Sequence, residues 1–263
     1  MTKLADKVVW ITGASSGIGE ALAVLSSQLG AKLVLTARRE AELQRVRAAC
    51  ADPQRVAVLP LDLTEFDAVA AAAQAAAFFG PIDILVNNAG ISQRSLLKDT
   101  EMAVYRRIME LDFFATVALT KALLPTMLAR KSGHLVVISS VIGKFGAPLR
   151  TGYAAAKHAL QGFYDAARAE VWRDGIKITL VCPGYIRTQV SVNAITADGG
   201  KHGKMDAGQN KGMAPMQCAG AIVRAIEAER EEVLIGWQEA VFVKIKQYAP
   251  RLFSAMIKRS AAS

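Results

Sequence analysis

KVVWITGASSGIGEALAVLSSQLG, residues 7–30, indicates a buried strand, a glycine-rich turn and a helix, in that order. The run from Lys7 to Thr12 is mostly apolar, and apolar residues then recur with a helical period until Gly30 ends the pattern. The first turn of a helix offers unpaired N–H groups and a positive dipole to phosphate. A strand that leads through glycines into a helix is therefore the context in which a dinucleotide phosphate binds.

The glycines of this turn follow the spacing Gly-x-x-x-Gly-x-Gly, which differs from the more usual Gly-x-Gly-x-x-Gly. The first glycine permits a tight turn, and the other two let the backbone approach a pyrophosphate and let the helix approach the sheet. We expect the nucleotide site to include the following residues of the turn: Gly13, Ser15, Ser16, Gly17, Ile18 and Gly19.

Short apolar runs alternate with helical segments from here to Cys182. Strands that are apolar throughout and are separated by helices indicate a parallel sheet covered on both faces, with right-handed crossovers. We predict one α/β domain over residues 1–263, a doubly wound Rossmann-type fold with a mostly parallel sheet of about seven strands flanked by helices. Long helices are expected near Glu101 to Arg130 and Gly152 to Arg173.

Residues 189–215, which follow the sixth strand, are polar and rich in glycine. Open α/β sheets bind ligands beyond the carboxyl ends of their strands, so we predict a substrate lid here. A disordered insertion is the alternative. Four apolar residues favour partial packing of the segment: Val190, Val192, Ile195 and Met205.

Residues 237–263 are predicted to form an amphipathic helical extension, which Pro250 interrupts. Lys244, Arg251 and Lys258 flank its apolar stripe. A basic amphipathic helix can lie on an anionic membrane, although such a stripe more often forms core or oligomer contacts. The stripe consists of Val241, Phe242, Ile245, Tyr248, Leu252, Phe253 and Met256.

The composition excludes several classes of protein. The formal charge is +9, but the basic residues are spread along the chain without interleaved aromatics, which argues against a nucleic-acid-binding protein. Three scattered cysteines and three isolated histidines offer no metal-ligand spacing. Two charges lie among the first six residues, and no run reaches the roughly 20 apolar residues that span a bilayer. We therefore expect no signal peptide, no metal and a cytoplasmic location, with peripheral membrane contact as a further option.

Tyr153 and Lys157 are four residues apart in a helical run, and Ser140 lies thirteen positions before the tyrosine. Positions i and i+4 share a helix face, so the ammonium group can approach the phenol and favour its ionised form. Such a phenol can act as a general acid and base near neutral pH. A Tyr-x-x-x-Lys pair alone is a weak signal, since many exposed helices carry one. The glycine turn strengthens it.

These motifs together resemble the short-chain dehydrogenase/reductase family. Within it, the stretch from Pro183 to Asp198 is similar to the branch that includes dehydrogenase/reductase member 7B and its bacterial relatives. The matching segments, in chain order, are the glycine turn, Asp62, Asn87-Asn88-Ala89-Gly90, Ser140, the pair Tyr153 and Lys157, and Pro183-Gly184-Tyr185-Ile186-Arg187-Thr188.

The resemblance implies a nicotinamide nucleotide site. Asp62 would contact the adenine and Asn87 would bind near the adenosine ribose, although Asn and Gly also favour a plain strand-ending turn. Ile186 and Thr188 would hold the nicotinamide carboxamide and the phosphate bridge. Leu63 and Gly90 belong to the same expected set of cofactor-binding residues.

The resemblance also implies the reaction, a hydride transfer between C4 of the nicotinamide and a carbonyl or carbinol carbon. Tyr153 would move the proton, Ser140 would hydrogen-bond the reacting oxygen, and Lys157 would bond the nicotinamide ribose. Ser139 is the adjacent candidate for the serine role, but the spacing to the tyrosine matches Ser140. A homo-oligomer formed through the two long helices is expected by the same resemblance.

Asp112 departs from the family pattern, which commonly has asparagine at the matching position, where it helps to hold a water that links the lysine to solvent. An aspartate has nearly the same shape, but its negative charge favours protonated lysine. We expect the proton relay to survive in altered form, with Asp112 as a fourth residue of the catalytic set.

Arg38 and Arg39 follow the second strand, and Ala37 stands where an acidic residue would repel a 2′-phosphate. We therefore predict NADP(H) as the cofactor, while the alternative is that both arginines merely begin an exposed helix, as Glu40 suggests. The apolar lid residues favour a small hydrophobic carbonyl or alcohol substrate, such as a lipid, steroid-like or retinoid-like compound. A non-catalytic NADP(H)-binding regulator is the competing function.

Overall fold

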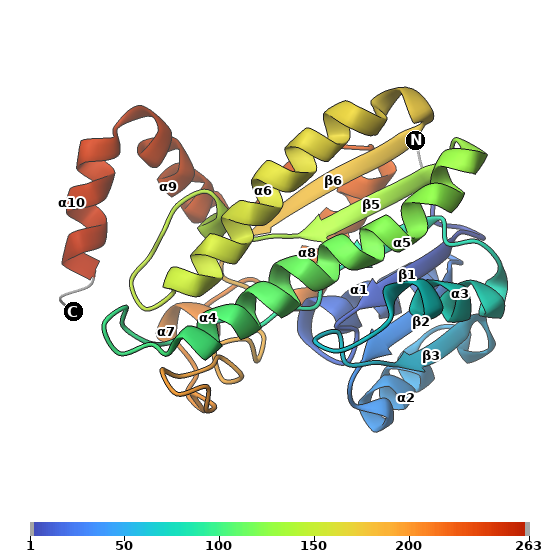
Figure 1. Ribbon diagram of the computed structural model, residues 1–263, viewed down its shortest axis with the longest axis horizontal. Helices are drawn as coiled ribbons and strands as arrows, with labels where there is room; N and C mark the ends of the chain where they lie inside the picture. Colours follow the sequence, from blue (N-terminus) through green and yellow to red (C-terminus); the bar gives the residue numbers. More distant parts are fainter. Residues whose placement is uncertain (1–2, 261–263) are drawn as a thin grey trace.

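The apolar runs of the sequence form a seven-stranded sheet, and all the paired strands are parallel (Figure 1). The computed structural model describes residues 3–260 of the protein. The spatial order of the strands is β3-β2-β1-β4-β5-β6-β7. Their bounds are β1 (Val8–Thr12), β2 (Lys32–Ala37), β3 (Val56–Pro60), β4 (Ile84–Asn87), β5 (Gly133–Ile138), β6 (Ile176–Pro183) and β7 (Glu232–Ile235).

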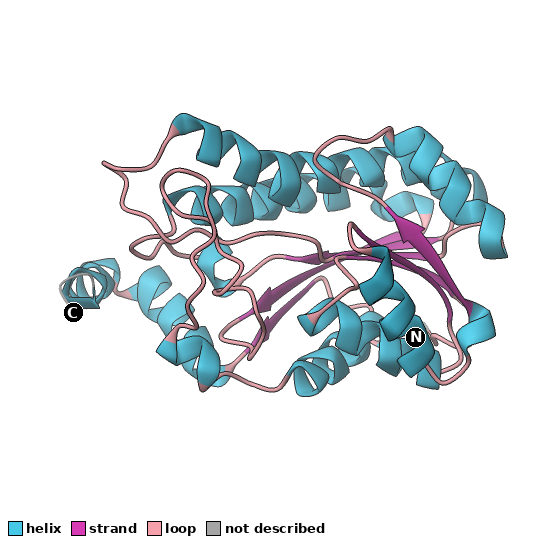
Figure 2. Ribbon diagram, turned by 90° about the horizontal axis from the view of Figure 1, so that it is seen from below, coloured by secondary structure: helices cyan, strands magenta, loops and turns pink. Residues whose placement is uncertain are grey.

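Helices cover both faces of this sheet, as the view along its edge shows (Figure 2). Three of them, α1 (Gly17–Gln28), α2 (Glu40–Ala49) and α8 (Pro215–Glu227), contribute to the core on one face. The other face packs against α3 (Ala68–Phe79), α5 (Ala115–Arg130) and α6 (Thr151–Val171). The predicted doubly wound α/β fold is thus confirmed.

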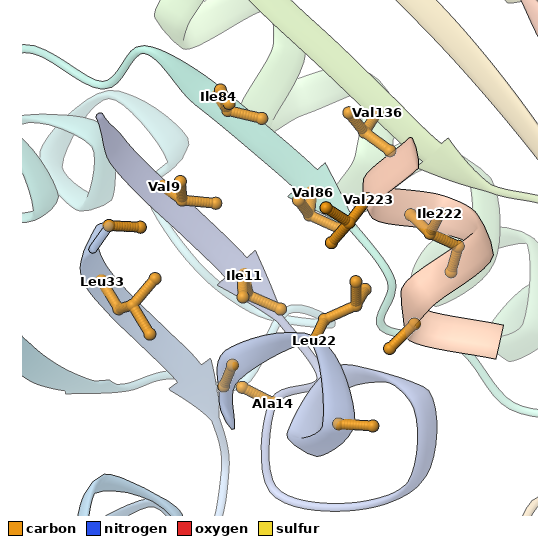
Figure 3. Close-up of a cluster of buried hydrophobic side chains, with 14 of the residues drawn as sticks. Val9, Ile11, Ala14, Leu22, Leu33, Ile84, Val86, Val136, Ile222 and Val223 are labelled. Atoms are coloured by element: carbon orange, nitrogen blue, oxygen red, sulfur yellow. The ribbon is translucent and has the colours of Figure 1, made fainter. Parts of the chain in front are cut away.

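Successive residues of each strand supply the two cores in turn, because strand side chains alternate between the faces of a sheet. Val9 and Ile11 lie in the core with Leu22 of α1 and Val223 of α8, whereas Trp10 lies in the opposite core (Figure 3). Burial on both faces explains why the strands are apolar throughout.

The chain reverses direction across the sheet at β1. It runs from β1 outward through β2 to β3, and then returns to the other side of β1 to place β4. The loops that leave the carboxyl ends of β1 and β4 therefore diverge and leave a crevice between them. In open α/β sheets this point of reversal is where ligands bind.

The helix predicted as continuous from Glu101 to Arg130 is interrupted. It consists of α4 (Met102–Met109), a π-helical turn over Glu110–Phe114, and α5. A single π turn inside a helix frequently marks a functional site, and this one contains Asp112. By length and composition alone Met102–Arg130 could cross a membrane, but core helices of water-soluble domains meet the same test, and Leu119 and Met127 are buried against the sheet.

Residues 189–215 are anchored to the domain at several points. Ser191 and Ala194 are fully buried, and Ile195 packs against Val104 and Ile108 of α4. The segment contains the short helix α7 (Ala207–Asn210). The segment is therefore packed against the domain in this structure rather than disordered. Its role as a lid stays a prediction.

The C-terminal extension forms two helices, α9 (Trp237–Tyr248) and α10 (Pro250–Ser260). The chain breaks at Ala249 because the residue before a proline is disfavoured in helical conformation. The expected apolar stripe is therefore divided between two helices. Residues 1–2 of the predicted domain and 261–263 of the predicted extension lie outside the described residues. Short 3₁₀ turns complete the described elements at Pro53–Arg55, Val141–Gly143 and Trp172–Asp174.

Buried His134 in β5 should make the stability of the fold depend on pH. Its Nε2 lies 2.8 Å from the Thr179 hydroxyl, and burial lowers the pKa of His134 from its ordinary value of 6.5 to about 4. Between these pH values the unfolded chain binds the extra proton, so the free energy of unfolding should fall on acidification, by at most about 3 kcal/mol from this group. Urea unfolding at several pH values should show this slope, and His134→Gln should flatten it. The exposed-site control His158→Gln should leave it unchanged.

Candidate active site

A cavity of about 1580 Å³ lies at the carboxyl ends of the strands. The glycine turn after β1 borders one part of it, and the ends of β4, β5 and β6 border the centre. Residues of α6, of the 189–215 segment and of the C-terminal helices complete the walls. The cavity thus occupies the crevice that the sheet topology creates.

The structure brings most of the predicted site residues to this one cavity. Gly19 and Asn87 are placed behind its wall. The residues on the wall are Gly13, Ser15, Ser16, Gly17, Ile18, Arg38, Arg39, Asp62, Leu63, Gly90, Asp112, Ser140, Tyr153, Lys157, Ile186 and Thr188.

The glycine turn has the backbone that its sequence requires. Gly13 has φ +64°, and a β-carbon there would lie 2.8 Å from the Ala89 Cα. A β-carbon on Gly19 would lie 2.3 Å from the Gly13 carbonyl oxygen, so only glycine lets α1 start this close to the turn. The N-terminus of α1 is consequently open toward the cavity at Ser16 and Gly17.

Asn88, rather than Asn87, joins this turn to β4. The Asn88 side-chain amide donates to the carbonyl oxygens of Thr12 and Gly13 at 3.0 and 3.2 Å. Asn87 is buried, and its amide donates to the Thr120 hydroxyl at 3.4 Å. The Asn-Asn sequence marks the position, but only the geometry shows which amide holds the glycine turn.

Three arginines and one carboxylate line the part of the cavity near the ends of β2 and β3. Arg38, Arg39 and Arg107 all line the wall with Asp62. Burial would raise the pKa of Asp62, but hydrogen bonds from Thr64 and the charges of Arg38 and Arg107 outweigh it, so the pKa lies below its ordinary value. Arg107 lies in α4, outside any motif, so the sequence analysis missed it. The excess of cations suits a phosphate group.

Close helix packing positions Tyr153 and Lys157 in the first turns of α6. Gly152 lies where a β-carbon would be 2.7 Å from the Tyr105 ring, and its N–H donates to the Gln93 side chain at 2.7 Å. The Lys157 Nζ lies 5.6 Å from the centre of the Tyr153 ring. Tyr153 is half-buried and faces the cavity, so the phenol and the ammonium share one environment.

Lys157 forms a buried ion pair with Asp112. The Nζ lies 3.3 Å from the Asp112 Oδ2 and donates to the Ile138 carbonyl at 3.1 Å, while Oδ1 of the same carboxylate accepts from the Ile91 N–H at 2.8 Å. Burial would lower the pKa of Lys157, but the charges of Asp112 and Tyr153 outweigh it and raise the pKa. Lys157 therefore stays a cation, and the expected influence of Asp112 on it has a direct contact as its basis.

The two serines after β5 have different partners. The Ser139 hydroxyl donates to the Lys157 carbonyl at 3.2 Å and accepts from the Gln161 amide at 2.9 Å. Residues of α6 therefore use both its donor and its acceptor capacity. The Ser140 hydroxyl has longer contacts, 3.4 Å to the Pro183 carbonyl and 3.2 Å from the Ile142 N–H. Ser140 is thus better placed than Ser139 to turn its hydroxyl toward a ligand oxygen.

Asp206 ties the 189–215 segment to two loops beside the cavity. Its Oδ2 lies 2.5 Å from Arg94 and 2.9 Å from Arg150, and the Arg94 side chain is only 5% exposed. Burial would raise the pKa of Asp206, but the Arg94 hydrogen bond and the charges of Arg94, Arg150 and His202 outweigh it and lower the pKa. The contact therefore stays ionic through the neutral range, and it is lost only when the pH falls below the ordinary aspartate value.

Asp206→Asn should loosen this segment, because it leaves the buried Arg94 without a counter-charge. We expect faster limited proteolysis between residues 189 and 215 and a several-fold loss in kcat/KM with an accepted substrate. The matched control is Asp165→Asn, which removes an exposed carboxylate from an ion pair with Arg168 on α6. Equal proteolysis rates in the two variants would contradict the anchoring role.

Across residues 3–260, no group of three or more histidine, cysteine, aspartate or glutamate side chains is arranged to hold a metal ion. The cations and hydroxyls of the cavity are instead suited to phosphate, ribose and a reacting oxygen.

Comparison with known proteins identifies relatives along nearly the whole chain. The sequence profile described as short chain dehydrogenase matches residues 7–198. The dehydrogenase/reductase SDR family protein 7-like of Anopheles gambiae is 48% identical over 239 residues, which cover 88% of this chain and 75% of the relative. The dehydrogenase/reductase SDR family member 7B of Rattus norvegicus is 42% identical over 259 residues, covering 95% and 80%.

Solved structures share the architecture. A short-chain dehydrogenase from Streptomyces avermitilis superposes with a TM-score of 0.82 at 29% identity, covering 98% of each chain. A short-chain dehydrogenase/reductase from Burkholderia phymatum, solved in complex with NAD, gives a TM-score of 0.84 at 24% identity, covering 96% of each chain. The latter similarity concerns the fold alone.

Proposed function

The chain belongs to the short-chain dehydrogenase/reductase family, on the branch of family members 7 and 7B, and from this premise we propose that it is an NADP(H)-dependent oxidoreductase that interconverts a carbonyl and a secondary or primary alcohol. One observation carries the proposal. Tyr153, Lys157 and Ser140 line the same cavity as the glycine turn and the N-terminus of α1. The residues proposed for proton transfer and for binding the nucleotide phosphates therefore border one cavity.

The protein's own residues would manage the proton and the position of the substrate. When bound, the nicotinamide supplies or accepts the hydride. Tyr153 donates a proton to the carbonyl oxygen in reduction and removes it from the alcohol in oxidation. Ser140 donates a hydrogen bond to that oxygen and stabilises its developing charge, a type of contact worth a few kcal/mol in other enzymes. Lys157 keeps a positive charge beside the phenol.

The arginines at the ends of β2 and β3 support a preference for NADP(H). Arg38 and Arg107 leave a net positive charge around Asp62, and Ala37 places no carboxylate in the way of a 2′-phosphate. The branch relatives support the family but do not specify the nucleotide. A fluorescence titration that gave tighter binding of NADH than of NADPH would contradict the preference.

Arg38→Gln should weaken NADPH binding by roughly 10- to 100-fold, because it removes a charge-assisted bond to the 2′-phosphate. NADH lacks that phosphate, so its dissociation constant should change by less than about twofold. Arg47→Gln is the matched control, since Arg47 lies in α2, donates to the Pro53 carbonyl at 2.9 Å and does not line the cavity. Equal losses for both nucleotides in Arg38→Gln would assign the residue to folding rather than to phosphate recognition.

The rest of the cavity wall supports a hydrophobic substrate. Beyond Tyr153 the wall includes the apolar side chains of Phe145, Leu149, Val192 and Phe242. A cavity of this size with these apolar side chains in its wall suits a lipid-like or polycyclic carbonyl compound better than a small polar one. A panel of ketones and aldehydes followed by NADPH absorbance, weighted toward long-chain and polycyclic compounds, tests both the activity and this class of substrate.

We also propose that the protein forms a homo-oligomer through α5 and α6, as the sequence analysis expects. Phe114, at the end of the π turn, is 51% exposed, and its ring contacts Phe113, which in turn contacts Phe163 of α6. Phe114 would be buried against the second subunit at such an interface, where aromatic residues are enriched. Sedimentation velocity measures the oligomeric state directly.

A further inference from the structure

Helices α9 and α10, hereafter the C-terminal pair, are barely covered by the rest of the protein. Of residues 238–259, whose side chains are all described, Phe253 alone is buried. Tyr248 and Leu252 are 77% and 56% exposed. Phe145 of the domain contacts the pair, and its ring centre lies 5.2 Å from that of Phe253. Both ribbon views show the pair standing out from one end of the molecule (Figures 1 and 2).

The C-terminal pair is strongly basic. Its sequence from 237 to 260 contains five cationic side chains and one carboxylate. The carboxylate, Glu239, accepts a hydrogen bond from the Tyr185 backbone N–H at 2.9 Å and so faces the domain. The cations are Lys244, Lys246, Arg251, Lys258 and Arg259. Exposed apolar and cationic side chains thus share one projecting element whose only negative charge is directed inward.

The C-terminal pair also forms part of the cavity wall. Phe242, Met256 and Ile257 of the C-terminal pair line the cavity, together with Leu149. The loop of Leu149 is joined to the loop after β4, since the Ser95 N–H donates to the Leu149 carbonyl at 3.2 Å. Leu149 is 40% exposed and Leu97, on the second loop, is 71% exposed. Leu149 thus adds an exposed apolar side chain to the cavity wall, and Leu97 lies on the loop joined to it.

We propose that the C-terminal pair docks the protein on the surface of an anionic lipid bilayer. Apolar side chains beside lysines and arginines match a surface that is apolar below and negatively charged above. A two-fold interface with a second copy of the chain would instead bring this basic patch against itself, because such an interface uses the same surface of both subunits. The charge therefore favours lipid over self-association. The docking stands independently of the proposed reaction.

Vesicle co-sedimentation of the full-length protein tests the docking. We expect binding to vesicles that contain phosphatidylglycerol, weak binding to pure phosphatidylcholine, and a loss of binding as salt is raised. The double variant Lys244→Gln, Lys258→Gln should bind anionic vesicles roughly 20- to 30-fold more weakly, at about fivefold per cation. Leu252→Ser should also weaken binding, by a smaller factor.

Matched variants elsewhere on the surface control for charge and apolarity. The pair Lys3→Gln, Lys121→Gln removes two exposed cations far from the C-terminal pair in sequence, and Val69→Ser removes an apolar side chain that is 71% exposed on α3. Both should bind vesicles like the original protein. Circular dichroism and the thermal midpoint show that each variant is folded without reference to any activity.

Two results would overturn the proposal. One is equal affinity of the original protein and the Lys244, Lys258 variant for anionic vesicles, including the case in which neither binds. The other is that Leu252→Ser leaves vesicle binding unchanged while sedimentation velocity shows a smaller oligomer, because the C-terminal pair would then be an interface between copies of this chain.

Discussion

Tyr153→Phe should lower the rate of carbonyl reduction by roughly 10²- to 10⁴-fold, the range over which a positioned acid–base group contributes. The substitution removes one hydroxyl and keeps the ring that lies 5.6 Å from the Lys157 ammonium. Nothing else that lines the cavity changes. The dissociation constant of NADPH should therefore stay within about twofold of the original value, since the lost hydroxyl acts on the reacting oxygen rather than on the phosphates.

Single-turnover kinetics with saturating NADPH give the rate, and fluorescence titration gives the affinity. Tyr105→Phe is the matched control, because the Tyr105 hydroxyl lies 3.1 Å from the Thr151 hydroxyl at the start of α6 but outside the cavity lining. The control should retain nearly full turnover. Similar losses in the two variants would mean that the Tyr153 effect comes from disturbed helix packing.

The same variant separates the two functions that the sequence allows. A regulator that only senses NADP(H) needs the glycine turn and the N-terminus of α1, and the hydroxyl of residue 153 adds nothing to that task. Unchanged behaviour of Tyr153→Phe in every assay would favour the regulator. Loss of turnover with retained NADPH affinity would favour the enzyme over the regulator, because the hydroxyl would then serve proton transfer and not nucleotide binding.

The order of the strands and helices and the position of the cavity could be predicted, because both depend on patterns within short stretches of sequence. Apolar runs predict the positions of the strands. The glycines of residues 13–19 predict the turn, because Gly13 has a positive φ and Gly19 lies too close to a carbonyl oxygen for a β-carbon. The parallel sheet then places the ends of β1, β4, β5 and β6 at one edge. The i, i+4 spacing predicts Tyr153 and Lys157 as a pair, and the family resemblance adds Ser140 to them.

The residues that the sequence analysis missed act over long separations in the chain. Asp206 meets Arg94 across 112 positions and Arg150 across 56, and no local spacing signals either contact. Arg107 reaches the neighbourhood of Asp62 only because α4 is packed beside the cavity. The π turn at Asp112 likewise has no signature in helix propensity, since ordinary helix formers surround it. Tertiary contacts determine the Asp206 ion pairs, the position of Arg107 and the π turn.

Lys157→Met should abolish measurable turnover and also destabilise the protein by roughly 3 to 5 kcal/mol. The methionine leaves the Asp112 carboxylate buried, with 0% exposure, and removes the ammonium 3.3 Å from its Oδ2. Among the described neighbours the Ile91 N–H then remains as its hydrogen-bond donor. A buried charge without its partner is among the most destabilising changes that a single substitution makes.

A second substitution separates the two losses. Asp112→Asn keeps the size of the side chain and an oxygen for the Ile91 N–H, but removes the charge. In the double variant Lys157→Met, Asp112→Asn, urea unfolding should therefore show most of the lost stability restored, while turnover stays at the level of Lys157→Met. Recovery of both would mean that Lys157 serves only to neutralise Asp112, and recovery of neither would mean that the fold needs the lysine for another reason.

Asp112→Asn alone completes the comparison. It keeps Lys157, so turnover should persist, but it removes a negative charge that opposes formation of a phenolate at residue 153. The acid limb of the pH–rate profile for alcohol oxidation should consequently move to lower pH, whereas Asp165→Asn, which removes an exposed carboxylate from the same helix as Lys157, should leave it in place. An unmoved profile in Asp112→Asn would show that the buried carboxylate does not tune the proton transfer. A shifted profile would show that the buried carboxylate, through its ion pair with Lys157, tunes the proton transfer.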